Sequence, residues 1–242
     1  MTSSTEGIVI HALKYGETSI ITRIFTRELG MQSYLVRGVR KSRSSRKQYL
    51  FQPLTMVQMV VSHKEKAGLN YIREIQLLDP YHTIPVEIKK TSLAIFLAEI
   101  LSHALKNQEA NEGLFLFLRT ALLHLDNTRD AVTNFHLVFL VGLSKYLGFH
   151  PGNNHGKHHR FFNLREGVYQ PSPDANQNMM DEEESQAFMT ITGSSLENQH
   201  QLNISKALRK RLLQKTIDYY RYHLAGMPEV KSLSVLETIF SD

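Results

Sequence analysis

The first 80 residues of the 242-residue chain alternate between short apolar runs and turn signals. Five of these runs are rich in β-branched residues, and none is interrupted by a helical period: residues 7–13, 18–26, 31–39, 54–61 and 70–77. Five short strands at this spacing predict a small antiparallel barrel, since closing a sheet removes its exposed edges. An OB-type barrel fits best because it is five-stranded, and an SH3-like barrel remains the alternative.

The apolar period changes after Asp79–Pro80 and becomes helical. Helices are predicted at residues 85–107, 112–125, 130–147, 181–191 and 204–224, with a last short one near the C-terminus. Gly148 is the expected C′ residue of the third helix, and Asn203 the expected N-cap of the fifth. Between them, residues 150–178 are irregular and suggest a small hairpin. We therefore predict a two-domain α+β fold, with an OB-fold nucleic-acid-binding domain at 1–80 and a helical bundle domain at 81–242. The bundle would carry an irregular, cysteine-free hairpin insert at about 150–180.

Composition narrows the protein class. The chain has no cysteine, which excludes disulfides, thiol nucleophiles and cysteine-ligated zinc. The N-terminus shows no basic segment followed by an apolar one, and the densest apolar run, residues 137–143, is too short to span a bilayer. We therefore expect a cytoplasmic protein.

Positive charge is concentrated in the first third of the chain. Residues 1–80 hold 12 Lys or Arg against 6 Asp or Glu, whereas residues 81–242 hold 16 against 17. No acid occurs from Leu29 to Lys64, and six cations fall between Tyr34 and Phe51: Arg37, Arg40, Lys41, Arg43, Arg46 and Lys47. Cations on a loop between strands suit a nucleic-acid partner, because they displace condensed counterions from phosphates. A solvated charge run is the alternative.

Aromatic residues flank the basic segment at Tyr34, Tyr49 and Phe51. Such rings can stack on unpaired bases, although each position also suits the barrel core. A second group of cations, Lys206, Arg209, Lys210 and Lys215, lies on one face of the 204–224 helix. That face could bind nucleic acid or an acidic partner, or could simply be solvated.

Catalytic and metal-binding signatures are weak. His150, His155, His158 and His159 fall within ten residues, but no cysteine or carboxylate completes a four-ligand site, so we expect no metal. A pH-sensitive cationic patch with Lys157 and Arg160 is the preferred interpretation. The chain has no phosphate loop, nucleophile elbow or dinucleotide fingerprint, and the basic segment has no acids to hold Mg²⁺ for a nuclease. We expect no catalytic residues and no enzymatic activity.

Several motifs resemble those of the RecO family of bacterial DNA repair and recombination mediator proteins. They are Y-G-E-x-x-x-I-x-x-x-F-T-x-x-x-G at Tyr15–Gly30, R-G-x-R-K-x-x-S at Arg37–Ser44, Y-L-G-F-x-P at Tyr146–Pro151 and F-N-L-R-E-G-V-Y at 162–169. Many family members carry four cysteines in the insert, and this chain has none. The family's zinc is therefore not expected here, and side-chain packing would have to hold the insert.

The resemblance implies a protein without cofactors that binds single- and double-stranded DNA and anneals complementary strands. It further implies work with RecR and RecF to load RecA onto DNA coated with single-strand-binding protein, in the bacterial cytoplasm at the nucleoid. Lys14, Arg23, Lys64 and Lys66 could extend the track formed by the cations between 37 and 47. Lys206, Arg209 and Lys210 could receive the acidic tail of single-strand-binding protein. An RNA-binding OB module, such as a ribosome-associated factor, is the alternative function.

Overall fold

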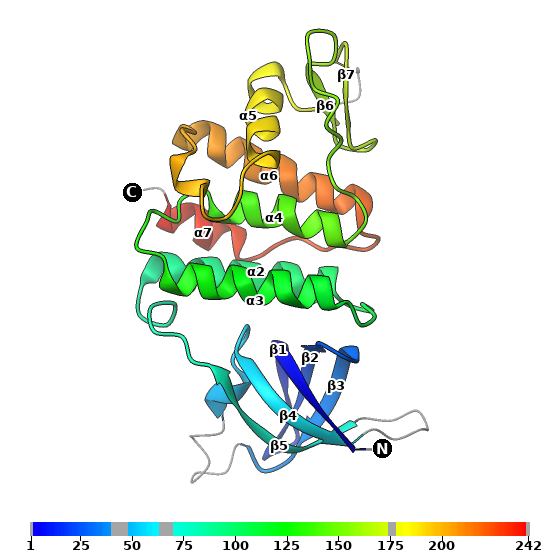
Figure 1. Ribbon diagram of the computed structural model, residues 1–242, viewed down its shortest axis with the longest axis vertical. Coiled ribbons are helices and arrows are strands. Elements are labelled where there is room, and N and C mark those ends of the chain that lie inside the picture. Colours follow the sequence, from blue (N-terminus) through cyan, green and yellow to red (C-terminus); the bar gives the residue numbers. More distant parts are fainter. Residues whose placement is uncertain (1, 40–47, 63–69, 174–177, 241–242) are drawn as a thin grey trace. The chain divides into compact units, whose positions relative to one another are not determined.

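A computed structural model of the chain describes residues 2–39, 48–62, 70–173 and 178–240 (Figure 1). The chain divides into two compact units, Met1–Asp126 and Asn127–Asp242. Each unit has its own core and is described by itself. None of the helices in the described ranges is long and apolar enough to cross a membrane.

The N-terminal unit begins with a closed barrel of five strands. These are β1 (Thr2–Tyr15), β2 (Ser19–Thr26), β3 (Gly30–Val36), β4 (Met56–Ser62) and β5 (Asn70–Asp79). Their order around the barrel is β1-β2-β3-β5-β4, and the long β1 closes it by pairing with both β2 and β4. Only the β3–β5 pairing is parallel among those described. The OB-type barrel predicted from the strand pattern is confirmed.

Alternating residues of each strand fill the barrel. Val9, Ile24, Val57 and Met59 are buried in one cluster, together with Leu50 and Phe51 of the short 3₁₀ helix η1 (Tyr49–Phe51). Leu50 and Phe51 thus add apolar side chains from the connection between β3 and β4 to the core of the barrel.

Two helices complete the N-terminal unit, α2 (Ile88–Ala104) and α3 (Glu112–Asn127). The turn between β3 and its neighbour β2 comes close to the segment that joins these helices. Gly30 has φ +66°, and a Cβ there would lie 2.5 Å from the Gln108 carbonyl oxygen, which accepts a hydrogen bond from Met31 N. Only glycine satisfies both the positive φ and the close approach.

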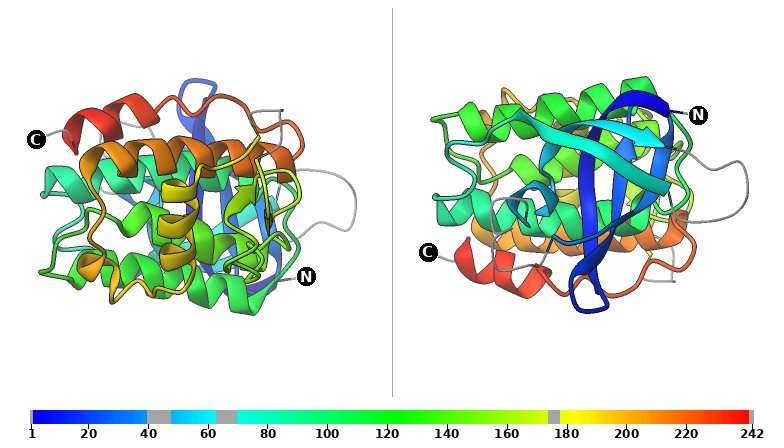
Figure 2. Two further views of the ribbon diagram at one scale, coloured as in Figure 1. Left: turned by 90° about the horizontal axis from the view of Figure 1, so that it is seen from above. Right: turned by 90° about the horizontal axis from the view of Figure 1, so that it is seen from below.

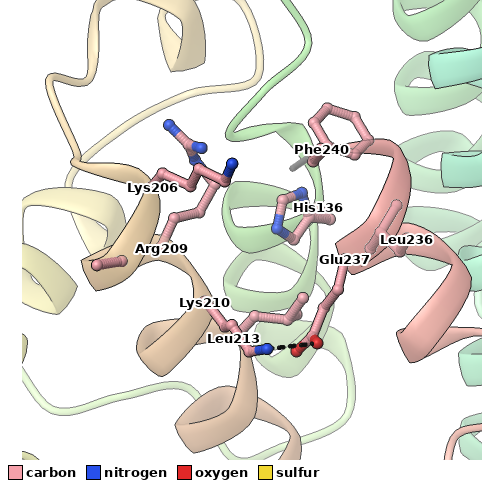
Figure 3. A pocket seen from close by; sticks show the side chains of 9 residues that line it. His136, Lys206, Arg209, Lys210, Leu213, Leu236, Glu237 and Phe240 are labelled. Atoms are coloured by element: carbon pink, nitrogen blue, oxygen red, sulfur yellow. Dashed lines mark ion pairs between the residues drawn. The ribbon is translucent and has the colours of Figure 1, made fainter. Parts of the chain in front are cut away.

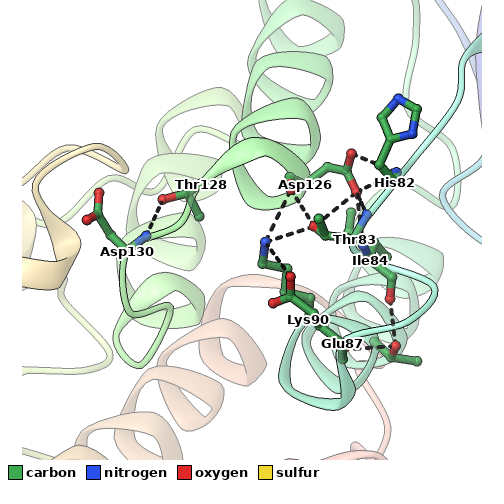
Figure 4. A network of polar contacts seen from close by, with 9 residues as sticks. His82, Thr83, Ile84, Glu87, Lys90, Asp126, Thr128 and Asp130 are labelled. Carbon is green, nitrogen blue, oxygen red and sulfur yellow. Dashed lines mark hydrogen bonds and ion pairs between the residues drawn. The ribbon is translucent and has the colours of Figure 1, made fainter.

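The start of α2 is fixed by a buried carboxylate near the end of α3 (Figure 4). Asp126 accepts hydrogen bonds from the backbone amides of His82, Thr83 and Ile84 at 2.8–3.1 Å. Burial acts to raise the pKa of Asp126, but the hydrogen bonds from these amides outweigh it and hold the pKa below its ordinary value. Lys90, also buried, donates to Thr83 Oγ1 at 2.8 Å and to the Asp126 carbonyl at 3.2 Å.

The C-terminal unit contains α4 (Phe135–Tyr146), α5 (Glu182–Thr192), α6 (Lys206–His223) and α7 (Leu233–Ile239). It also contains a two-stranded hairpin, β6 (Phe161–Asn163) and β7 (Val168–Gln170), and the 3₁₀ helix η2 (Gln199–Gln201). Helices α4, α5 and α6 pack on one another, and β6 packs on α5 (Figure 2). The expected hairpin insert is confirmed, and Asp181 and Glu184 form a capping box at the start of α5.

Aromatic rings hold the insert. Phe162 of β6 lies 5.0 Å from Tyr169, 4.8 Å from Phe188 and 5.4 Å from Tyr219, measured between ring centroids. All four side chains are buried. The Asn154 side chain adds two hydrogen bonds, to Tyr169 N and Tyr169 O. Within the described residues no three His, Asp or Glu side chains gather as a metal site.

Two sequence predictions about helices were wrong in detail. Helix α4 begins at Phe135 rather than 130, since Thr128 and Asn134 use their side chains in local and long-range hydrogen bonds. The N-cap of α6 is Ser205, whose hydroxyl accepts from Leu208 N at 3.2 Å, and not Asn203. Tyr219 of the same helix is 1% exposed, because the hairpin insert covers it. The expected C′ glycine, Gly148, has φ +86° and is confirmed.

Candidate nucleic-acid interface

The basic segment of the barrel begins at Arg37, directly after β3. Arg40, Lys41, Arg43, Arg46 and Lys47 lie outside the described residues, as do Lys64 and Lys66. The residues that adjoin these two segments are described, and they come together. Leu35 of β3 pairs with Tyr71 of β5, and the exposed Arg37 guanidinium lies 5.9 Å from the centre of the Tyr71 ring. The parallel β3–β5 pairing therefore brings Arg37, at the start of one cationic segment, next to Tyr71, which follows the other segment in the chain.

The β1–β2 hairpin carries a further cation and two exposed apolar side chains. Lys14 is exposed, and its neighbours Leu13 and Tyr15 are 57% and 53% exposed. In the right view of Figure 2 this hairpin, in dark blue, extends beyond the neighbouring strands. An exposed ring beside a lysine can stack on a base while the amine contacts a phosphate. Lys14 was predicted as a DNA contact and Tyr15 was not, although an aromatic residue next to a cation and a turn is visible in the sequence.

Arg23 has partners within the N-terminal unit. Its guanidinium donates to the carbonyl of Ser102 at 3.3 Å and to that of Lys106 at 2.9 Å, at the C-terminal end of α2. A positive charge is favourable there because carbonyls point out of that helix end. These contacts give Arg23 a structural role, so a DNA contact by this residue would have to share its donors.

The three aromatic residues that flank the basic segment differ in exposure. Tyr34 is fully buried and Phe51 is 5% exposed, so both belong to the barrel core and present no ring to a base. Tyr49 is 50% exposed. Tyr71, half-buried beneath Arg37, was not among the predicted stacking rings. Only the β3–β5 pairing brings it next to Arg37, and this pairing is not visible in the sequence.

Comparison with known proteins gives the family. The family description "Recombination protein O N terminal" matches residues 1–81, and "Recombination protein O C terminal" matches residues 86–233. The chain belongs to the RecO family. It is 38% identical over 242 residues to DNA repair protein RecO of Flavobacterium psychrophilum, and 35% identical over 241 residues to that of Phocaeicola vulgatus. Both alignments cover 100% of each chain. The resemblance inferred from the motifs is thus confirmed.

A groove in the C-terminal unit of this RecO-family chain brings three cations of α6 together (Figure 3). It has a volume of about 490 Å³, and its walls are the N-terminal half of α6, the start of α4 and the helix α7. Its apolar part consists of Leu213, Leu236 and Phe240, and its cations are Lys206, Arg209 and Lys210. The groove thus combines an apolar floor with positive charge.

The three cations differ in how they are engaged. Lys210 Nζ lies 2.9 Å from Glu237 of α7, and Arg209 donates to Asn134 Oδ1 at 2.9 Å and to the Ile204 carbonyl at 2.8 Å. Lys206 is exposed and forms no ion pair with the described residues. A fully solvated face, one of the alternatives left open by the sequence, does not describe Arg209 or Lys215. Both are partly buried, and the Lys215 amine donates to the Met179 carbonyl at 2.9 Å.

Proposed function

We propose that the chain is a non-enzymatic DNA-binding mediator of recombinational repair. It binds single- and double-stranded DNA through the barrel at residues 1–80, anneals complementary strands and helps to load recombinase onto DNA coated with single-strand-binding protein. It acts in the bacterial cytoplasm at the nucleoid, with RecR, RecF, RecA and single-strand-binding protein as partners. Its relatives carry the name DNA repair protein RecO, which supports the repair role.

The observation that carries the proposal is the cation distribution on the barrel. All of the chain's excess positive charge falls in residues 1–80. Arg37, at the start of one cationic segment, lies beside Tyr71, which follows the other segment in the chain. Two DNA strands that approach each other are repelled by their phosphates, and cations that neutralise both backbones lower this repulsion. Strand pairing by this route needs no active site.

The test is the salt dependence of DNA binding. With about six phosphate contacts, the logarithm of single-strand affinity should fall against the logarithm of salt with a slope of about −4. Reversing Arg40, Lys41 and Arg43 to Glu should abolish binding, while the thermal transition of the protein stays unchanged. Unchanged affinity in this variant would refute the assignment of the basic segment.

Annealing of strands coated beforehand with single-strand-binding protein tests the mediator role. The wild-type chain should accelerate pairing of the coated strands, and the triple reversal should not. Competition between RNA and DNA of the same sequence separates the proposal from an RNA-binding module, because only RNA offers the 2′-hydroxyl. Cleavage of labelled DNA with Mg²⁺ or Mn²⁺ would contradict the non-enzymatic role.

The groove beside α6 is proposed as the site for the acidic tail of single-strand-binding protein. Lys206 and Lys210 supply positive charge, and Leu213, Leu236 and Phe240 supply an apolar surface. Acidic peptides with apolar side chains need both features in one place.

A further inference from the structure

A second groove lies within the N-terminal unit, beside the end of the barrel where η1 packs. It has a volume of about 480 Å³. Its walls come from η1 and the turn that follows, from the end of β5 and from α2, and include Tyr49, Pro53, Leu54, Tyr81 and Ile95. An apolar cavity of this size with few polar groups has the character of a ligand site.

Large apolar side chains are exposed along one rim of this groove. Tyr49 is 50% exposed on η1, and Ile95 is 53% exposed on α2. Ile88, 64% exposed, lies seven residues before Ile95 and therefore on the same face of that helix. Exposed apolar residues grouped around a groove mark a binding surface more often than scattered ones do.

The wall of the groove contains a strained backbone position. Leu54 has φ +66°, the only positive φ of a non-glycine residue within the described ranges. Its amide donates to the Val9 carbonyl at 2.6 Å, and its carbonyl accepts from Tyr81 Oη at 2.7 Å. A bulky residue in this conformation costs free energy, and such positions concentrate at binding sites.

The polar groups of the groove suit the edge of a base. Gln52 is exposed, and its amide offers both a donor and an acceptor. Asp79 would repel a phosphate, but Arg119 Nη2 lies 2.9 Å from its carboxylate and offsets the charge.

We propose that this groove receives an unpaired base of single-stranded DNA, with the Tyr49 ring stacked on it. This inference rests on the proposed DNA-binding function and deepens it. Tyr49 follows Lys47 by two residues in a stretch with no acid from Leu29 to Lys64, so the chain carries a cation within two residues of this ring. A base enters such a site at the lowest cost from a single strand, since in a duplex it is stacked and paired.

The test compares Tyr49→Ala with Tyr49→Phe in the full chain, using a single strand, an abasic strand of the same length and a blunt duplex. Loss of one stacked ring should weaken single-strand binding about tenfold. Tyr49→Phe should bind as the wild type does, and neither variant should change the affinity for the abasic strand or the duplex. Tyr222→Ala, which removes an exposed ring from α6, is the matched control and should have no effect.

Equal single-strand affinity of Tyr49→Ala and wild type would overturn the inference while leaving DNA binding intact. Equal loss on all three ligands would also overturn it, because the effect would then not depend on the base. Absence of DNA binding by the wild type would overturn the proposed function itself. As a direct measurement, a strand that carries 5-iodouracil should crosslink to Tyr49 on irradiation. Crosslinks confined to Tyr15 or Tyr71 would contradict the assignment.

Discussion

One of the residues that line the groove of the C-terminal unit is a buried histidine. His136 of α4 is 2% exposed, and its ring centroid lies 6.0 Å from that of Phe240. Burial, with a smaller effect from the charge of Arg209, lowers the pKa of His136 to about 3. The imidazole is therefore neutral in the folded protein at physiological pH, and the positive charge of the groove comes from Lys206, Arg209 and Lys210 alone.

This lowered pKa predicts a loss of stability in mild acid. In the unfolded chain His136 binds a proton near pH 6.5, but in the folded protein only near pH 3, so the unfolded state binds more protons between these values and the free energy of unfolding falls as pH falls. Between pH 7.5 and pH 5 the loss should be about 2 kcal/mol. Urea denaturation at both pH values should show a smaller loss in His136→Gln than in wild type. The exposed His158→Gln is the control, and an unchanged pH dependence in His136→Gln would contradict the assigned pKa.

Among the elements, the cysteine-free insert hairpin is held by packing of aromatic rings. Phe162 contacts three rings from β7, α5 and α6, which fixes the hairpin against both helices. Phe162→Ala should lower the free energy of unfolding by about 3–5 kcal/mol, since it removes a fully buried ring and leaves a cavity. Val168→Ala, at a 38% exposed position on the adjacent strand, should change it by no more than about 0.5 kcal/mol. Thermal unfolding should not respond to a chelator, and a chelator-induced drop would show that a metal contributes.

Elements with a regular apolar period were predictable, and those that depend on distant partners were not. The five strands followed from alternation and turn residues, whose effects are local. By contrast, α2 exposes Ile88 and buries Lys90, the reverse of what its apolar stripe suggests. The reason is that Thr83 and the carbonyl of Asp126 receive the Lys90 amine, and Asp126 lies 36 residues further along the chain.

The candidate site was predictable to a similar extent. The cationic residues are visible in the sequence because charge density needs no fold. Tyr71 and the groove beside Tyr49 were not, since they arise from the β3–β5 pairing and from the packing of α2 near η1. The sequence alone also left open whether the three flanking rings stack on bases or belong to the barrel core. Their burial in the structure answers this, because two are buried and one is exposed.

For the whole molecule, the charge distribution predicts two ligands on two separate surfaces. Residues 1–80 carry a net charge of +6, and residues 81–242 one of −1 with a local group of cations at the α6 groove. Lys206→Glu with Lys210→Gln should weaken binding of a synthetic acidic peptide with the tail sequence of single-strand-binding protein at least tenfold, because both changes remove positive charge from the groove. Single-strand DNA affinity should stay within about twofold, since the proposed DNA contacts belong to the N-terminal unit and the groove to the C-terminal unit.

The reversal of Arg40, Lys41 and Arg43 to Glu is the complementary variant and should give the opposite pattern, with DNA binding lost and peptide binding kept. Fluorescence anisotropy with each labelled ligand at one salt concentration measures both affinities on the same protein preparations. If one set of substitutions lowered the affinities for both ligands equally, the two surfaces would act as a single electrostatic site. Annealing of coated strands should then separate the variants further: the groove variant should still pair bare strands but fail on coated ones, because only coated strands require recognition of the acidic tail.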